Sequence, residues 1–408
     1  MAEPSNKLTT HTPIPLPSIA VSMQMVAKHH GVSGWRQLID IVKLRFGPGK
    51  ISPHEYYQQR LYRASLSRAD KRCYQGASQS YKLIAATTAP EHFGSRSILD
   101  DKPVFLALCE ASDIPVTHTQ GRFSLIRQIG QWAHLDSADA IADFLLKSAK
   151  YPLFGKPDAG RQSYGCVQIE RLTDDGHLVF VGEEIGPHVN ALAAEIEQKF
   201  PGGYLFQTCL ETAVPLRALT PDAIGPLRIM TIYDKQDEPS ALLGLMRSPL
   251  SGTYAGPGKG KQIVMSTVDL QNAVLMKSKL YEGGKNQHIT THPITGIDLD
   301  GFSLPQLPDA IKLALRSHKM LPMIGVIGWD IAMTDHGPVI IEGNSNPAVG
   351  KYQAVDERGI LNPDFAPKIA AAQARAAAQS ATLQAITNAR QKGTIRELVA
   401  LERSKFKS

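Results

Sequence analysis

The segment GWDIAMTDHGPVIIEGNSNP, residues 328–347, contains the side chains with the clearest capacity for chemistry. Two apolar strands, 324–333 and 338–343, joined by a Thr-Asp-His-Gly turn, are predicted to cover most of it. Glu342 and Asn344 are two positions apart, so their side chains share one face of the second strand. A short hairpin brings Asp330 opposite them. We therefore expect three oxygen ligands to converge, as Mg²⁺ requires when the phosphates of a nucleotide complete its shell.

An ion-pair explanation of the two acidic residues is the alternative. The strands around Asp330 and Glu342 are otherwise apolar, and a carboxylate there is costly without a cation or another partner. An arginine or a lysine could be that partner. This explanation leaves Asn344 and the turn at Pro347 without a role, so we favour the metal site.

Lys156 ends the strand predicted at 151–156, and the turn Asp-Ala-Gly-Arg-Gln-Ser-Tyr-Gly follows it. A flexible turn of this kind, which includes Gly160 and Ser163, can fold over phosphates and offer backbone N–H donors. The lysine supplies a point charge for a phosphate. Without the segment at 328–347, an ordinary surface hairpin would explain this pattern equally well.

The segment from Gln207 to Glu211 is a second candidate for contact with a nucleotide. Here a short apolar strand is followed by polar residues. We interpret it as an inter-domain hinge whose backbone meets the edge of an adenine. Leu210 belongs to the same segment, and Glu211 is the candidate for the ribose. An ordinary strand end explains the pattern about as well.

Two arginines interrupt apolar strands. Arg228 lies in Pro-Leu-Arg-Ile-Met-Thr, and Arg247 follows Leu-Met. Cations are seldom buried without an anionic partner, so either could hold the γ-phosphate or a substrate carboxylate. A structural salt bridge is the alternative. His292, in Thr-His-Pro-Ile-Thr-Gly, is a candidate substrate contact, although a capped turn histidine explains it better.

The elements that position these residues indicate an α+β protein with helical ends. Apolar positions at helical spacing predict one helix over 19–46, and Ser-Pro-His-Glu at 52–55 predicts the capped start of a short one. The domains that we expect are a helical N-terminal extension (1–75), an N-terminal lobe (76–150), a small lobe with the phosphate loop and hinge (151–212), a large lobe with the metal site (213–366) and a helical tail (367–408).

Composition excludes several classes of function. The chain has 408 residues, 43% hydrophobic and 20% charged, with a formal charge of +6. Lysine and arginine are spread along it, which argues against nucleic-acid binding. The four cysteines are far apart with no CxxC pair, which argues against a zinc site and a disulfide framework. No signal-peptide pattern and no apolar run of membrane length occur, so we expect a cytoplasmic protein without membrane contact.

The order of these features resembles the ATP-grasp superfamily. The specific part is the spacing from Asp330 to the Glu-x-Asn motif with its trailing proline. More narrowly, the chain is similar to the sugar-transfer-associated, glutamate-ligase-related ATP-grasp family, over about residues 34 to 365. The segments that carry the resemblance are ISPHEYYQQRLY near 51, PLRIMTIY near 226, THPITG near 291 and GWDIAMTDHGPVIIEGN.

Two departures from the family pattern concern the substrate side. Pro-Leu stands before Arg228 where Asn-Thr is expected, and the loop at 248–262 reads SPLSGTYAGPGKGKQ where a more regular Asp-Asn and Gly-Gly pattern is expected.

The resemblance implies two α+β lobes that grip ATP, two Mg²⁺ ions and an acyl-phosphate intermediate. The implied roles are metal binding by Asp330, Glu342 and Asn344, contact of Lys156 with the α- and β-phosphates, an adenine and ribose pocket at Gln207 to Glu211, and stabilisation of the transferring phosphoryl group by Arg228 and Arg247.

The implied activity is ATP-dependent ligation of a small-molecule carboxylate to an amine, with release of ADP and phosphate. A kinase that phosphorylates a hydroxyl would have the same metal site. A nucleotide-binding partner of a glycan-synthesis system, without catalysis, is the third interpretation. Neither the two substrates nor the oligomeric state follows from the sequence, and a homodimer stays open.

Overall fold

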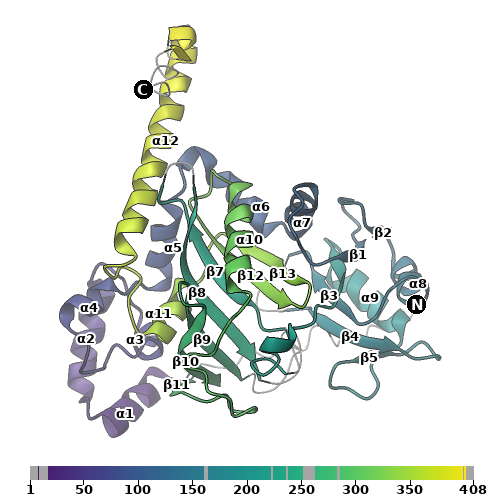
Figure 1. Cartoon of the computed structure of the whole chain (residues 1–408), viewed down its shortest axis with the longest axis horizontal. Coiled ribbons are helices and arrows are strands. Elements are labelled where there is room, and N and C mark those ends of the chain that lie inside the picture. Colours follow the sequence, from purple (N-terminus) through teal and green to yellow (C-terminus); the bar gives the residue numbers. More distant parts are fainter. Residues whose placement is uncertain are drawn as a thin grey trace.

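The computed structural model describes residue 8 and residues 17–159, 164–221, 224–235, 238–250, 262–282, 285–397 and 399–400. Within these residues the strands form two sheets, which lie side by side in Figure 1. We call them the smaller sheet and the larger sheet. In the described part of the chain, every helix is too short or too polar to cross a lipid bilayer.

The smaller sheet has the strand order β2-β1-β6-β3-β4-β5. Two helices, α8 (Ala138–Lys147) and α9 (Val189–Lys199), pack against each other and share one core with its strands. The strands are β1 (Thr119–Phe123), β2 (Ala133–Leu135), β3 (Leu153–Pro157), β4 (Val167–Leu172), β5 (Leu178–Phe180) and β6 (Tyr204–Thr208).

The larger sheet has the order β11-β10-β9-β8-β7-β12-β13. Its strands are antiparallel to their neighbours. They are β7 (Leu227–Ile232), β8 (Ser240–Pro249), β9 (Ile263–Asp269), β10 (Val274–Glu282), β11 (Lys285–Ile289), β12 (Val326–Thr334) and β13 (Gly337–Asn344).

Helices cover both faces of the larger sheet because successive side chains of a strand point to opposite faces. Ile229 of β7 packs in a core with α10 (Leu307–Lys319). The next residue, Met230, packs with α11 (Val349–Asp356) and α12 (Ala366–Lys392). Every residue of β7 is buried, as a central strand with two covered faces requires.

The N-terminal extension differs from the expectation of one helix over 19–46. Two helices occur there, because Gly31 takes a left-handed conformation with φ of 66° and Ser33 caps a new start. The capped helix expected at Ser52 is confirmed, since Ser52 and Glu55 form a capping box. The helices of the extension are α1 (Ile19–His30), α2 (Gly34–Phe46), α3 (Pro53–Gln58) and α4 (Arg68–Cys73). After the extension come α5 (Ala77–Ala85), η1 (Pro90–Arg96), α6 (Ser97–Asp100) and α7 (Lys102–Ala111).

The chain passes between the two sheets along two neighbouring segments, residues 112–118 and 209–213. All strands of the smaller sheet lie between them in the sequence. The segments lie together, because the Thr208 N–H donates to the His118 carbonyl at 2.9 Å. The second segment then meets the larger sheet, where the Ala213 N–H donates to the Met333 carbonyl of β12, and continues into η2 (Val214–Leu216).

Candidate active site

The register of β12 and β13 brings the three predicted metal ligands together. Asp330 lies directly opposite Glu342, and Gly328 lies opposite Asn344. The Asn344 amide donates to Glu342 Oε1 at 3.3 Å. Asp330 is buried and Glu342 is partly exposed. Two carboxylates and one side-chain amide therefore meet at the open end of the hairpin, away from the turn.

Asp330 is also paired with arginine, as the alternative explanation of the sequence anticipated. On its other side β12 pairs with β7, which places Arg228 opposite Asp330. Arg228 Nε lies 2.7 Å from Asp330 Oδ1, and Arg228 Nη2 lies 2.6 Å from Oδ2. Arg247 Nη1 from β8 lies 3.7 Å from the same Oδ2. Burial alone would raise the pKa of Asp330, but Arg228, with Arg247, holds this pKa below its ordinary value.

Glu342 is not accounted for by this ion pair. Its Oε1 is 4.0 Å from Arg228 Nη2, beyond hydrogen-bond distance. Burial and the neighbouring Asp330 raise the pKa of Glu342, against the opposing charges of Lys156 and Arg228. A carboxylate in this setting gains from an added cation.

The three candidate ligands suit a Mg²⁺ site in which phosphates and water supply the remaining ligands. Within the described residues no group of three or more His, Cys, Asp and Glu side chains could hold a metal ion. The candidate ligands are instead two carboxylates and an amide oxygen. Mg²⁺ is commonly bound by one or two carboxylates together with substrate phosphates and water, without a complete protein cage. Asp330, Glu342 and Asn344 match that form.

Lys156 approaches this cluster from the smaller sheet. It lies on β3 and is buried, and within the described residues its ammonium has no hydrogen bond or ion pair. Burial lowers the pKa of Lys156, and Glu342 is the main opposing charge. The two sheets therefore face each other here, with a buried ammonium on one and paired carboxylates on the other. A phosphate placed between them would satisfy the ammonium.

The remaining predicted nucleotide contacts have different positions. Gly160 and Ser163 lie outside the described residues. The Gln207 amide donates to Thr119 Oγ1 at 3.0 Å, so its side chain joins β6 to β1. Leu210 and Glu211 lie on the segment that connects the two sheets, and the Glu211 side chain is 81% exposed. This segment thus connects the two sheets, and its contact with a nucleotide stays a prediction.

His292 lies in a turn of its own. Thr295 donates to His292 Nδ1 from its backbone N–H at 3.2 Å, and the Thr295 hydroxyl lies 2.9 Å from the same atom. Thr295 also bonds to the Ala218 carbonyl at 2.9 Å. Burial lowers the pKa of His292. These contacts are those of a turn-capping histidine, and none of them joins His292 to the cluster around Asp330.

Sequence reasoning missed Lys351, which lies in the first turn of α11. Lys351 lines a cavity of about 10 Å³ together with Arg228, Arg247 and Tyr352. The side chain reaches solvent, yet partial burial, Arg247 and Arg228 lower the pKa of Lys351 to about 8. The available signal was a helix start directly after Pro347, because a helix there presents its first turn to the preceding hairpin end.

The sequence of this chain matches the model of a known protein family. The model of the family described as sugar-transfer associated ATP-grasp matches residues 93–366. This chain belongs to that family. The expected α+β fold of the ATP-grasp type is thereby confirmed, with helical N-terminal and C-terminal parts around it. A search of curated proteins found no match.

Similar solved structures are distant. The D-alanine-D-alanine ligase from Coxiella burnetii is 12% identical over 72% of this chain and 62% of that chain, with a TM-score of 0.40. The VanG D-Ala:D-Ser ligase from Enterococcus faecalis is 14% identical over 69% of this chain and 62% of that chain, with a TM-score of 0.42. The biotin carboxylase domain of the 2-oxoglutarate carboxylase from Hydrogenobacter thermophilus, in complex with MgADP, is 13% identical over 69% of this chain and 47% of that chain, with a TM-score of 0.39. The chain spans less than two thirds of the length of these three chains.

Proposed function

We infer that this ATP-grasp protein is an ATP- and magnesium-dependent carboxylate–amine ligase. One observation carries the proposal, namely the convergence of Asp330, Glu342 and Asn344 with Arg228 and Arg247. Lys156 faces this cluster from the opposite sheet. An arrangement with a metal-type oxygen set and surrounding cations suits phosphoryl transfer between bound substrates, where positioning and charge stabilisation do most of the catalysis.

In the proposed reaction, a carboxylate oxygen of the first substrate bonds to the γ-phosphorus of ATP, and the bond to the β–γ bridging oxygen breaks. ADP leaves. The amine nitrogen of the second substrate then bonds to the acyl carbon, and phosphate leaves with the departing C–O bond. The amine loses a proton, and the products are an amide, ADP and phosphate.

The residues have separate proposed tasks. Lys156 holds the α- and β-phosphates, which replace the partner that its buried ammonium lacks among the described residues. Arg228 and Arg247 stabilise the negative charge that spreads over the γ-phosphoryl group. Asp330, Glu342 and Asn344 would hold two Mg²⁺ ions, which neutralise phosphate charge when bound. Because Arg228 forms two hydrogen bonds to Asp330, it must share or leave that carboxylate when the phosphates arrive.

The cations also suggest the charge of the substrate. Arg247 and Lys351 lie beside Arg228 and Asp330, around a cavity with room for about one water. Three cations, Arg228, Arg247 and Lys351, near the two carboxylates of Asp330 and Glu342 leave an excess of positive charge here. An acidic substrate, with a carboxylate or a phosphate besides the reacting group, suits this charge.

Asp330→Asn and Glu342→Gln test the proposal, because each removes a negative metal ligand with little change of shape. We expect each variant to lose at least about a hundredfold of substrate-dependent phosphate release, as removal of a transition-state contact does. Asp330→Ala is a poorer choice, since it would leave Arg228 buried without its partner. The assay supplies Mg-ATP and a pool of amino acids and small carboxylates.

Asp309→Asn, an exposed change on α10, is the matched control and should keep full activity. Mass spectrometry of the same mixture identifies the product. An amide together with free phosphate supports the ligase. A phosphorylated hydroxyl without phosphate release would replace it with the kinase, and unchanged turnover in both variants would refute the assigned metal ligands.

A further inference from the structure

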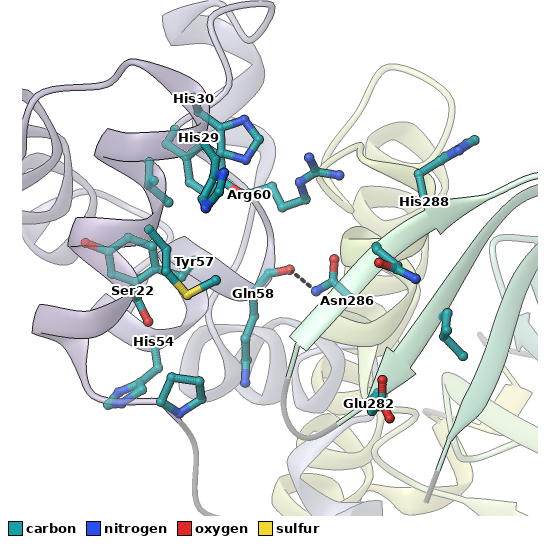
Figure 2. Close-up of a pocket in the computed structure, with 16 residues that line it drawn as sticks. Ser22, His29, His30, His54, Tyr57, Gln58, Arg60, Glu282, Asn286 and His288 are labelled. Carbon is teal, nitrogen blue, oxygen red and sulfur yellow. Dashed lines mark hydrogen bonds between the residues drawn. The ribbon is translucent and has the colours of Figure 1, made fainter. Parts of the chain in front are cut away.

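A second pocket lies far from the ATP site. It has a volume of about 660 Å³ and opens between the N-terminal extension and strands β10 and β11. Figure 2 shows residues of α1 and α3 on one side and Glu282, Asn286 and His288 on the other. The strand order places β11 five strand intervals from β12, which is roughly 24 Å. Its volume is in the range of small-molecule sites, roughly 300–1,000 Å³.

The lining of this pocket is rich in cationic and N–H donor groups. Four imidazoles and one guanidinium belong to its described lining, against one carboxylate, Glu282. Gln262 already donates to Glu282 Oε1 at 2.7 Å. Burial and the nearby Arg60 and His29 lower the pKa of His30, which agrees with positive charge gathered at this wall. The pocket therefore suits an anion.

Arg60 is the central cation of this lining. Its nearest carboxylate, Glu357, is 3.7 Å away and is held more closely by Lys279 at 2.7 Å and by Arg63. Glu357 is thus balanced by two other cations. Figure 2 shows the Arg60 side chain extending from the extension toward β11.

The backbone of Arg60 takes a left-handed conformation, which is unfavourable for a residue other than glycine. Helix α3 ends in a Schellman turn, in which the Leu61 N–H donates to the Tyr56 carbonyl and the Arg60 N–H to the Tyr57 carbonyl. Arg60 takes the left-handed conformation of that turn, with φ of 51°. Glycine is the usual residue there, because it carries no side chain to strain. An arginine at this place therefore has a side chain that the turn itself does not need.

Asn286 supplies a polar group without a partner. Its Nδ2 donates to the Gln58 carbonyl at 3.0 Å and so fixes β11 to the extension. Its Oδ1 is shielded from solvent and has no hydrogen-bond partner among the described residues. A ligand hydroxyl that reached this acceptor would supply the hydrogen bond that it lacks among the described residues. The buried Tyr62 and Val26 give the pocket an apolar portion as well.

We propose that this pocket binds a sugar phosphate, with its phosphate on Arg60 and the neighbouring imidazoles and its hydroxyls on Asn286 and Gln287. Phosphate matches the guanidinium. The sugar hydroxyls can form hydrogen bonds with the side-chain amides of Asn286 and Gln287. The carbon face of the sugar ring can pack against the apolar portion of the pocket. This site does not depend on the ligase reaction at Asp330.

Calorimetric titration of the full chain with glucose 1-phosphate tests the proposal, with glucose and inorganic phosphate as the two part-compounds. We expect saturable binding with a Kd of about 1 mM or tighter, weaker binding of phosphate, and no displacement by excess Mg-ATP. Arg60→Gly should weaken binding about tenfold or more. Asn286→Ala should weaken binding of the sugar phosphate but not of inorganic phosphate.

Lys50→Gly is the matched control. Lys50 is an exposed cation of the same extension, also left-handed with φ of 49°, and it does not line the pocket. This variant should bind like the unaltered protein. Equal affinity of Arg60→Gly and Lys50→Gly, displacement of the probe by ATP, or no saturable heat would overturn the proposal. If Arg60→Gly does not fold, Asn286→Ala decides by the same titration.

Discussion

Lys351 gives the candidate active site a positive charge that depends on pH. Its pKa is lowered to about 8 by partial burial and by Arg247 and Arg228, so its charge is present below that pH and is lost above it. If Lys351 holds an acidic substrate, turnover falls as pH rises through about 8. We expect Lys351→Met to lower substrate-dependent phosphate release about tenfold or more at pH 7, the loss of one charged hydrogen bond.

Lys351→Arg separates this effect from a structural one, because arginine keeps its charge above pH 8 and should move the alkaline fall to higher pH. Lys312→Met, on the exposed side of α10, is the control and should leave the profile unchanged. A profile of Lys351→Arg that coincides with the original would exclude Lys351 as the titrating group.

At this scale the sequence was informative where neighbours in the chain are also neighbours in space. Glu342 and Asn344 share a strand face, and the hairpin to Asp330 is short, so the period of two was enough to predict their meeting. Lys351 and Arg60 could not be found in this way. Their surroundings come from α11 and β11, whose positions depend on packing between distant segments.

Elements far apart in the sequence are joined by the Glu357 carboxylate at the end of α11. Lys279 of β10 is fully buried and donates to Glu357 Oε1 and to the Ala354 carbonyl, both at 2.7 Å. Arg63 of the extension bonds to the same carboxylate. Removing one partner of a buried pair leaves an uncompensated charge. Glu357→Gln should therefore lower the free energy of unfolding by about 3 kcal/mol.

Urea unfolding measures this effect. Glu238→Gln is the matched control, since Glu238 forms an exposed pair with Lys319 at 2.6 Å and should contribute less than about 1 kcal/mol. Equal effects of the two variants would mean that the Glu357 cluster contributes no more than a surface ion pair.

The same buried lysine explains why some elements escaped prediction. The strands at the metal site read as apolar runs, and they were expected close to their true bounds. Strand β10 instead reads Val-Leu-Met-Lys-Ser-Lys-Leu-Tyr-Glu, with lysines where a buried strand should be apolar. Its second lysine is Lys279, whose burial is possible only because a carboxylate almost eighty positions later folds over it. No local pattern contains that information.

The pH dependence of folding is a property of the whole molecule, and the buried His318 of α10 contributes to it. His318 is fully buried, with Nε2 2.8 Å from the Ile324 carbonyl and Nδ1 2.7 Å from the Thr231 hydroxyl. The Nε2 must therefore carry the proton and Nδ1 must accept. Burial lowers the pKa of His318 to about 4.

The unfolded chain binds this proton near pH 6.5, whereas the folded protein resists it down to about pH 4. Stability from His318 is thus complete above pH 6.5 and is lost as pH falls toward 4. Between pH 7 and pH 5 we expect a loss of about 2 kcal/mol in the free energy of unfolding. Urea unfolding at both pH values measures it. His318→Gln should remove that share of the slope, and an unchanged slope would contradict the assignment.

The two adjacent connections between the sheets also determine which relative motions the covalent chain permits. The strands of the smaller sheet lie within residues 119–208, and both ends of this stretch enter at one place, where Thr208 bonds to His118. A rotation about that line changes the separation of Lys156 and Glu342 without stretching either connection. Such a rotation would also move the buried contact that Leu106 of α7 makes with Trp132 and Leu205 of the smaller sheet, whereas the partly exposed ion pair between Arg127 and Asp101 adds little resistance. A nucleotide held by both sheets would then act as a noncovalent cross-link, and its binding energy would set the angle between them.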